Sequence, residues 1–164
     1  MELKRVVVTG LGAVTPVGNS VEEMWSNLLA GKSGAAPITS FDTTNFKTKF
    51  ACEVKDLNGN DYIDRKEARK MDRCTQLAMI SAIQAVKDSG MDLETVEKNR
   101  VGVVYGIGIG GIKTFQDEVV YYGQHMDRGP MFNPFFIPKM ISDIAAGQIS
   151  IHFGFHGPNY VTTS

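Results

Sequence analysis

Three glycines, Gly106, Gly108 and Gly111, have the spacing GxGxxG, in which backbone amides at the start of a helix bind the phosphates of a dinucleotide. A strand-like run precedes them and a helical pattern follows, as that motif requires. That motif also requires an acidic residue at the end of a second strand. Asp127 is at about the right distance, but it is surrounded by methionine, arginine, glycine and proline in a stretch that does not resemble a strand. The glycines therefore favour a tight turn that brings backbone close to a substrate channel, with a dinucleotide site as the alternative.

Two other patterns point to metal chemistry and lack the geometry for it. Residues 56–67 place oxygen-bearing side chains at the spacing of a calcium loop, but Asp61 stands where the sharp turn requires glycine. His152 and His156 are four residues apart, which suits two metal ligands on a continuous helix, and Gly154 interrupts that helix. We therefore expect no metal site and no cofactor.

The chain has two cysteines, Cys52 and Cys74, and each lies in an apolar pattern. Cysteines in such patterns pack as small hydrophobic residues, so we expect neither to act as a nucleophile. They offer no CxxC pair and no disulfide framework, which favours a reducing cytoplasm as the compartment.

A group of cations is a candidate binding surface. Lys66, Arg69, Lys70 and Arg73 recur at three- and four-residue spacing, which places them on one face of a predicted helix. Such a face is ordinarily solvated, and neighbouring acids partly neutralise it. It would also steer an acidic partner toward the protein, so a docking surface is the alternative interpretation.

The elements that must position these residues alternate between strand and helix. Apolar runs predict strands at residues 5–9, 49–54, 100–105 and 159–164, the first and third buried on both faces. Helical spacing, caps and terminal glycines predict helices at residues 20–29, 67–89, 112–124 and 141–153. Residues 131–138 hold two prolines and three phenylalanines and predict an ordered loop. The alternation predicts an α/β protein with a largely parallel sheet.

Composition narrows the function classes. Of 164 residues, 43% are hydrophobic and 21% charged, and the formal net charge is -1, which argues against a general nucleic-acid binder. The apolar run after the charged start, residues 6–8, is too short for a signal peptide, and no run approaches the ~20 residues of a membrane span. We expect no membrane insertion.

Five segments, in this order, resemble the β-ketoacyl-acyl-carrier-protein synthases of the second, elongating type. They are RVVVTGLGAVTPVGN at residues 5–19, RKEARKMDR at 65–73, GIGIGG at 106–111, NPFFIPKMISDIAAGQISI at 133–151 and GPNYVTTS at 157–164. The resemblance covers essentially the whole chain. It implies the thiolase-like fold, with residues 1–164 forming most of the first of two pseudo-equivalent α/β halves and the second half outside this sequence.

The resemblance also implies an acyltransferase of type II fatty-acid elongation, which joins an acyl-enzyme to malonyl-acyl-carrier protein by decarboxylative Claisen condensation. The nucleophilic cysteine would lie two positions past Ser164, and two histidines and a lysine would lie in the second half. We therefore expect no catalytic residue within 1–164 and no activity from this piece alone. The alternative within the same fold is a non-catalytic chain-length subunit, in which the cysteine is replaced.

The same resemblance implies roles for three residues in substrate binding. Ile109, in the glycine turn, matches the residue that gates the acyl channel. Phe135 and Phe136 match a loop that reaches across a homodimer and helps to line the partner's pocket.

Acyl carrier protein is the partner that the resemblance implies. Lys66, Arg69 and Lys70, hereafter the docking cations, match the basic helix on which it docks. Met131 and Phe132 stand where many relatives have two further basic residues, so part of the docking surface is expected to be weaker or rearranged.

Overall fold

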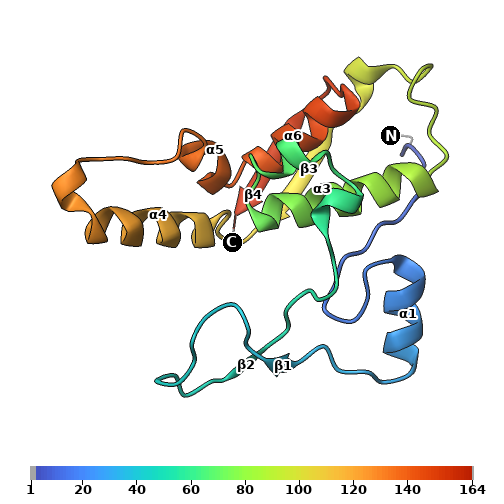
Figure 1. Cartoon of the computed structure of the whole chain (residues 1–164). Helices are drawn as coiled ribbons and strands as arrows, with labels where there is room; N and C mark the ends of the chain where they lie inside the picture. Colours follow the sequence, from blue (N-terminus) through green and yellow to red (C-terminus); the bar gives the residue numbers. More distant parts are fainter. Residues whose placement is uncertain (1–2, 164) are drawn as a thin grey trace. The chain divides into compact units, whose positions relative to one another are not determined.

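The computed structural model of the chain describes residues 3–163 (Figure 1). It contains two compact units, one made of residues up to Asn58 together with Ser81–Gly90, the other of Gly59–Ile80 together with the residues from Met91 onward. The long helix α3, Arg73–Asp88, contributes residues to both.

The first unit contains the predicted helix at residues 20–29, which the structure confirms as α1, Val21–Leu29. Ser20 caps it, because the Ser20 hydroxyl oxygen accepts a hydrogen bond from the Glu23 amide at 3.2 Å. Gly31, with φ of +65°, follows its end in the left-handed conformation that favours glycine. The predicted strand at residues 49–54 is reduced to β2, Phe50–Ala51, which pairs antiparallel with β1, Ala36–Pro37.

The predicted buried strand at residues 5–9 is wrong for this structure. The segment is irregular and its side chains are exposed, with Val6 at 90% and Val8 at 80%. A strand is stabilised by its pairing, and no strand of the described residues 3–163 pairs with this one. Apolar, β-branched composition predicts that a segment can join a sheet. A neighbouring strand must still supply the backbone hydrogen bonds that hold it there.

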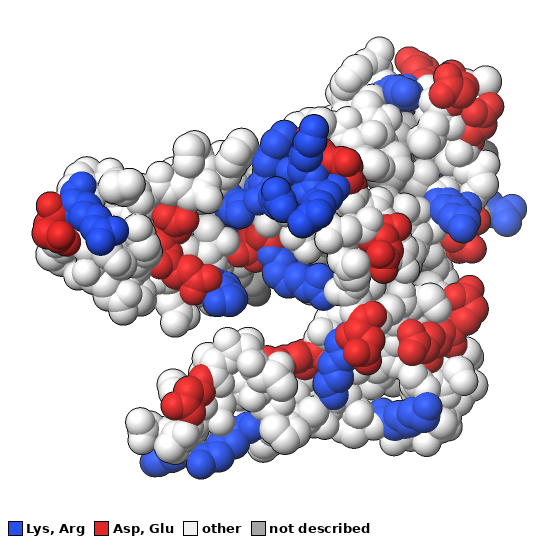
Figure 2. Space-filling view, viewed as in Figure 1, with Lys and Arg blue, Asp and Glu red and all other residues white. Residues whose placement is uncertain are grey.

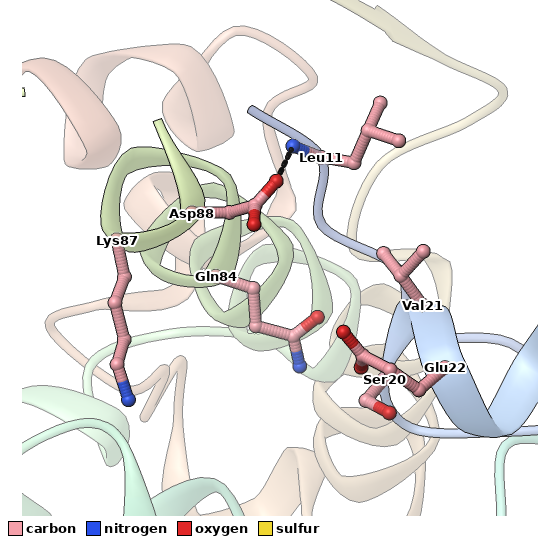
Figure 3. Close-up of a pocket in the computed structure, with 7 residues that line it drawn as sticks. All are labelled: Leu11, Ser20, Val21, Glu22, Gln84, Lys87 and Asp88. Atoms are coloured by element: carbon pink, nitrogen blue, oxygen red, sulfur yellow. Dashed lines mark hydrogen bonds between the residues drawn. The ribbon is translucent and has the colours of Figure 1, made fainter. Parts of the chain in front are cut away.

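The glycine-rich turn that follows is fastened to α3 by side chains. The Leu11 amide donates to the Asp88 carboxylate at 2.8 Å (Figure 3). The Ala13 amide donates to Gln84 Oε1 at 2.9 Å. Gly12 passes so close to α3 that a Cβ atom there would lie 2.0 Å from the Ser81 carbonyl oxygen. The glycine is therefore required for close backbone approach.

The single helix predicted at residues 67–89 is also wrong, because the structure divides it. The short helix α2, Arg65–Ala68, is capped by Asp64, whose carboxylate accepts from the Lys66 and Glu67 amides. The chain then starts a new helix, α3, where the Asp72 carboxylate accepts from the Cys74 amide at 3.0 Å. When a side chain caps the start of one helix, the backbone there cannot also continue the helix before it. The Asp72 cap therefore separates α2 from α3.

The second unit is built on a parallel pair of strands. β3, Val103–Ile107, pairs in parallel with β4, Asn159–Thr163, with Val103 opposite Asn159. The parallel pairing and the strand at residues 159–163 confirm the prediction, while Ser164 lies outside the described residues. The other strand begins later than predicted, because residues 98–100 form a 3-10 turn.

The remaining helices lie between these two strands in the sequence. α4, Ile112–Gln124, confirms the predicted helix, and a 3-10 turn at Met126–Arg128 follows it. The predicted loop at residues 131–138 contains the start of a short helix, α5, Phe136–Met140. Pro138 is tolerated there because it lies in the first turn, where its missing amide costs no intrahelical bond.

Helix α6, Ile144–Phe153, begins three residues after the predicted start and packs against both β3 and β4 (Figure 1). The fully or almost fully buried side chains of the second unit come from α3, with Thr75, Met79 and Ile80, and from α6, with Ala145 and Ala146. Because α6 packs on β3 and α5 packs on both α6 and α4, this core positions β3 directly and α4 through α5.

Within residues 3–163, no helix has both the length and the apolar character that crossing a membrane requires.

Candidate functional site

An open apolar pocket of about 430 Å³ lies at the end of β3. Its wall is formed by a residue of the turn after the strand, by the first turn of α4, and by the last residue of α5 with the two residues that follow it. The lining residues are Ile109, Ile112, Phe115, Met140, Ile141 and Ser142. Ile109, predicted from the resemblance as a gate, is 69% exposed and lies in this wall. The pocket could take an apolar chain, because its lining offers one hydroxyl and no charge.

The glycine turn between Ile109 and Ile112 brings the backbone close to the end of α5. Gly110 has φ of +88°, and the Gly111 amide donates to the Met140 carbonyl at 3.0 Å. A Cβ atom on Gly111 would lie 2.2 Å from the Lys139 carbonyl oxygen, so a side chain there would push α5 away. The glycines therefore hold the end of α5 against the start of α4.

The two predicted phenylalanines differ in their relation to the pocket. Phe136 stacks on Phe115, with ring centroids 6.3 Å apart, and on Phe132 at 5.4 Å. Phe115 is a lining residue, so the stack connects Phe136 to the pocket wall. Phe135 does not line the pocket: its side chain is 41% exposed and its amide donates to Asn133 Oδ1 at 2.8 Å.

The buried carboxylate of Asp72 lies against the first turn of α4, at the place where a dinucleotide phosphate would have to bind. Asp72 is 8% exposed, and its Oδ2 accepts from the Thr114 hydroxyl at 2.5 Å and from the Thr114 amide at 3.3 Å. A carboxylate occupying the amides of a helix start repels a second anion there. In addition, Gly106 lies inside β3 and not in a loop. The geometry thus argues against the dinucleotide alternative.

The docking cations lie on the segment at residues 65–73, which we call the cationic segment. Lys66 and Arg69 are exposed, and Lys70 forms an exposed ion pair with Glu67 at 2.7 Å. They do not share one helix face as predicted, because α2 ends at Ala68 and Arg69 is its C-cap. Figure 2 nevertheless shows Lys and Arg side chains gathered in one group over the part of the chain that carries α2. The surface is a cationic turn and not a helical stripe.

The cysteines differ in their surroundings. Burial, together with the charge of Asp72, raises the pKa of the Cys74 thiol to about 11, so this cysteine is protonated and a poor nucleophile. Cys52 was also predicted to be buried, and that prediction is wrong, because the residue is exposed. It follows β2, a strand of only two residues, which has too little sheet around it to cover the side chain.

The residues of the calcium-like pattern serve local structure. Asp64 caps α2, and Glu67 pairs with Lys70. His156 lies outside α6, which ends at Phe153, so the two histidines do not share a helix. Within residues 3–163, no three His, Cys, Asp or Glu side chains are grouped as ligands for a metal ion.

Sequence reasoning missed two parts of this site. Ile112 and Phe115 line the pocket, and their spacing of three residues on a predicted helix is a signal that could have found them. The hydrogen bonds between Asp72 and Thr114 had no such signal, because 42 residues separate the two.

This architecture is that of the ketosynthases. The ishigamide ketosynthase/chain length factor superposes with a TM-score of 0.85 at 28% identity, over 96% of this chain and 39% of that chain. A complex of a type II polyketide synthase acyl-carrier protein with its ketosynthase bound to the hexaketide, AntDE:AntF, superposes with a TM-score of 0.73 at 25% identity. That match covers 99% of this chain and 41% of the other. The predicted thiolase-like α/β fold is confirmed.

The chain belongs to the β-ketoacyl synthase family, because the model of that family's N-terminal domain matches residues 3–164. It is 46% identical over 162 residues to the 3-oxoacyl-[acyl-carrier-protein] synthase 2 of Staphylococcus aureus (strain COL). The alignment covers 98% of this chain and 38% of the relative, so the chain spans less than two fifths of the length of that protein. The resemblance predicted from five sequence segments is therefore confirmed.

Proposed function

We propose that the protein containing this chain is a 3-oxoacyl-acyl-carrier-protein synthase of type II fatty-acid elongation. The observation that carries the proposal is the family match over residues 3–164, together with a relative of that name at 46% identity. Residues 1–164 would form most of the first of two pseudo-equivalent α/β halves. The alignment supports this, since it covers 38% of the relative.

In the proposed reaction, a cysteine thiolate attacks the thioester carbonyl of acyl-carrier protein, and the carrier thiol leaves. Malonyl-carrier protein then loses carbon dioxide, and its carbanion attacks the acyl-enzyme. The cysteine thiolate leaves, and the product is a 3-oxoacyl chain two carbons longer on the carrier protein. The family resemblance puts the cysteine two positions past Ser164, just after β4, and puts the histidines and the lysine in the second half. Residues 1–164 would supply binding and positioning, with no catalytic residue.

The apolar pocket at the end of β3 is the proposed acyl site. An alkyl chain gains about 0.8 kcal/mol for each methylene that it buries, and this pocket offers aliphatic and aromatic walls. Ile109 is the proposed gate, since it lies in the wall and is exposed enough to change rotamer without disturbing the core. Phe136 would support the wall through Phe115, and exposed Phe135 would reach the pocket of a second copy in a homodimer.

Acyl carrier protein is the proposed partner, docking on the cationic segment. A net charge of -1 gives the chain no general attraction for an acidic protein, so the attraction must be local. Lys66 lies in α2 and Arg69 is its C-cap, and both are exposed, which supports this role. A ketosynthase of the same fold has been captured with its acyl-carrier protein. We also propose a cytoplasmic location, which the absence of a paired disulfide between Cys52 and Cys74 supports.

A chain-length subunit of the same fold is the second candidate, and the similarity to a ketosynthase/chain length factor favours considering it. Such a subunit would share the pocket and the docking surface but lack the nucleophile. The residue two positions past Ser164 distinguishes the two, since a cysteine there identifies the condensing enzyme.

Acylation of the full-length enzyme tests the proposal. Incubation with long-chain acyl-carrier protein should increase the intact mass by one acyl group, located by peptide mapping on the cysteine after β4. Ile109→Phe should block long chains while short chains still react, because the larger side chain fills the pocket mouth. Lys113→Gln, which breaks only an exposed ion pair with Asp117, is the matched control on the neighbouring helix turn. Absence of an acyl adduct, or unchanged long-chain acylation in Ile109→Phe, would contradict the assignment.

A further inference from the structure

One buried carboxylate, that of Asp72, caps two helices at once. Its Oδ1 accepts from the Cys74 amide at 3.0 Å, in the first turn of α3. Its Oδ2 accepts from the hydroxyl and the amide of Thr114, in the first turn of α4. The N-cap residue of α4 is Gly111, which has no side chain to cap the helix. Asp72, 39 residues earlier in the sequence, supplies the capping carboxylate instead.

The two capped helices begin at different functional regions. The start of α3 immediately follows the docking cations, so Asp72 lies at the end of the cationic segment. Thr114 lies between Ile112 and Phe115, and both of these residues line the apolar pocket. Asp72 therefore joins the predicted carrier-docking segment to the first turn of α4 through its two hydrogen bonds to Thr114, and its third hydrogen bond caps α3.

The carboxylate is placed to hold this link firmly. Asp72 is 8% exposed, so water competes little for its oxygens, and hydrogen bonds to a buried anion are stronger than those between neutral groups. The first turns of both helices direct backbone N–H groups toward it, so the carboxylate accepts from two elements at once. Ile112 and Phe115 are exposed at 53% and 42%, so the hydrogen bonds to Thr114 between them add to the limited packing that positions their side chains.

We propose that Asp72 is a positioning residue that fixes the first turn of α4 through Thr114, and thereby sets the length of acyl chain that the pocket accepts. The inference rests on the proposed function of the pocket. Asp72 and Thr114 touch no reacting atom in this account. They act by holding Ile112 and Phe115 where a long chain gains contact with both.

The test uses the full-length enzyme and compares kcat/KM for acylation by long-chain and short-chain acyl-carrier protein. Thr114→Val keeps the size of the side chain and removes the hydroxyl donor. It should lower long-chain kcat/KM about tenfold and leave the short-chain value within about twofold, the scale of one hydrogen bond to a charged group. Thr114→Ser should restore long-chain acylation, because it returns the hydroxyl. The matched control is Thr95→Val, which removes a hydroxyl bonded to Asp92 at 2.8 Å on the surface and should change neither value.

A second variant tests whether the two residues act together. Asp72→Asn should shift the chain-length preference in the same direction, and adding Thr114→Val to it should cause little further loss. Equal losses for long and short chains, failure of Thr114→Ser to rescue, or equal effects of Thr114→Val and Thr95→Val would each overturn the inference.

Ile109→Phe separates this inference from the proposed function. If Ile109→Phe blocks long chains while Thr114→Val has no effect, the pocket binds the acyl chain and only the role of Asp72 is wrong. If Ile109→Phe also has no effect on long chains, the pocket is not the acyl site and the proposed function of the pocket fails with it.

Discussion

Removing the Asp72 carboxylate should loosen two helix starts that are distant in the sequence. In Asp72→Ala, the Cys74 amide and the Thr114 amide lose the acceptor that the structure gives them, at 3.0 Å and 3.3 Å, and the Thr114 hydroxyl loses one at 2.5 Å. Loss of a capping side chain costs about 0.5–2 kcal/mol for one helix. Since about 1.4 kcal/mol corresponds to a factor of ten, each first turn should open about twofold to about thirtyfold more often.

Amide hydrogen exchange measures this opening directly in the full-length protein. We expect faster exchange in peptides that cover residues 73–76 and 112–115, with unchanged exchange in the last turn of α4. The control is Asp92→Ala, which removes an exposed carboxylate that accepts from the Glu94 amide at 3.0 Å and the Thr95 hydroxyl. It should affect only its own turn. Unchanged exchange at the start of α4 in Asp72→Ala would refute the double cap.

Three further predictions concern charge and ionisation. Reversing the charge of all three docking cations should slow carrier-protein association about tenfold at low salt and much less at high salt, as stopped-flow mixing would show; an unchanged rate at low salt would place docking elsewhere. Because burial raises the pKa of Cys74 to about 11, iodoacetamide at pH 8 should modify Cys52 and spare Cys74, and equal labelling would contradict the buried, protonated thiol. Hydrogen bonds from Ser40 and Thr39 lower the pKa of Glu53 to about 2, so these contacts should persist above pH 4.5 and be lost as pH falls through about 2. An NMR titration midpoint near 4.5 would exclude them.

Local signals predicted the elements that depend on local sequence. α1 was found because Ser20 caps it, Glu22 and Glu23 lie in its first turn and Gly31 follows it. The strand predicted at residues 159–164 is observed over 159–163, and its parallel pairing was predicted from the alternation of strands and helices. In these cases the residues that decide the structure lie within the element itself or next to it.

The predicted elements that proved wrong are those whose structure depends on contacts with distant residues or on a competing cap. The valines at residues 6–8 have strand composition, but composition does not supply a partner strand. Apolar spacing runs without interruption from Met71 to Val86, which concealed the break that Asp72 makes by capping α3. The resemblance identified Ile109 in the candidate site, whereas the bond between Asp72 and Thr114 could not be predicted because nothing local joins them.

Condensation by the full-length enzyme tests the central claim most directly. Supplied with acyl-carrier protein and malonyl-carrier protein, it should release carbon dioxide and form 3-oxoacyl-carrier protein in equal amounts, detected by mass spectrometry. Residues 1–164 alone should form none, since the proposed nucleophile lies beyond Ser164. Carbon dioxide release without ketoacyl product, or no turnover by the full-length protein, would contradict the assignment as a condensing enzyme.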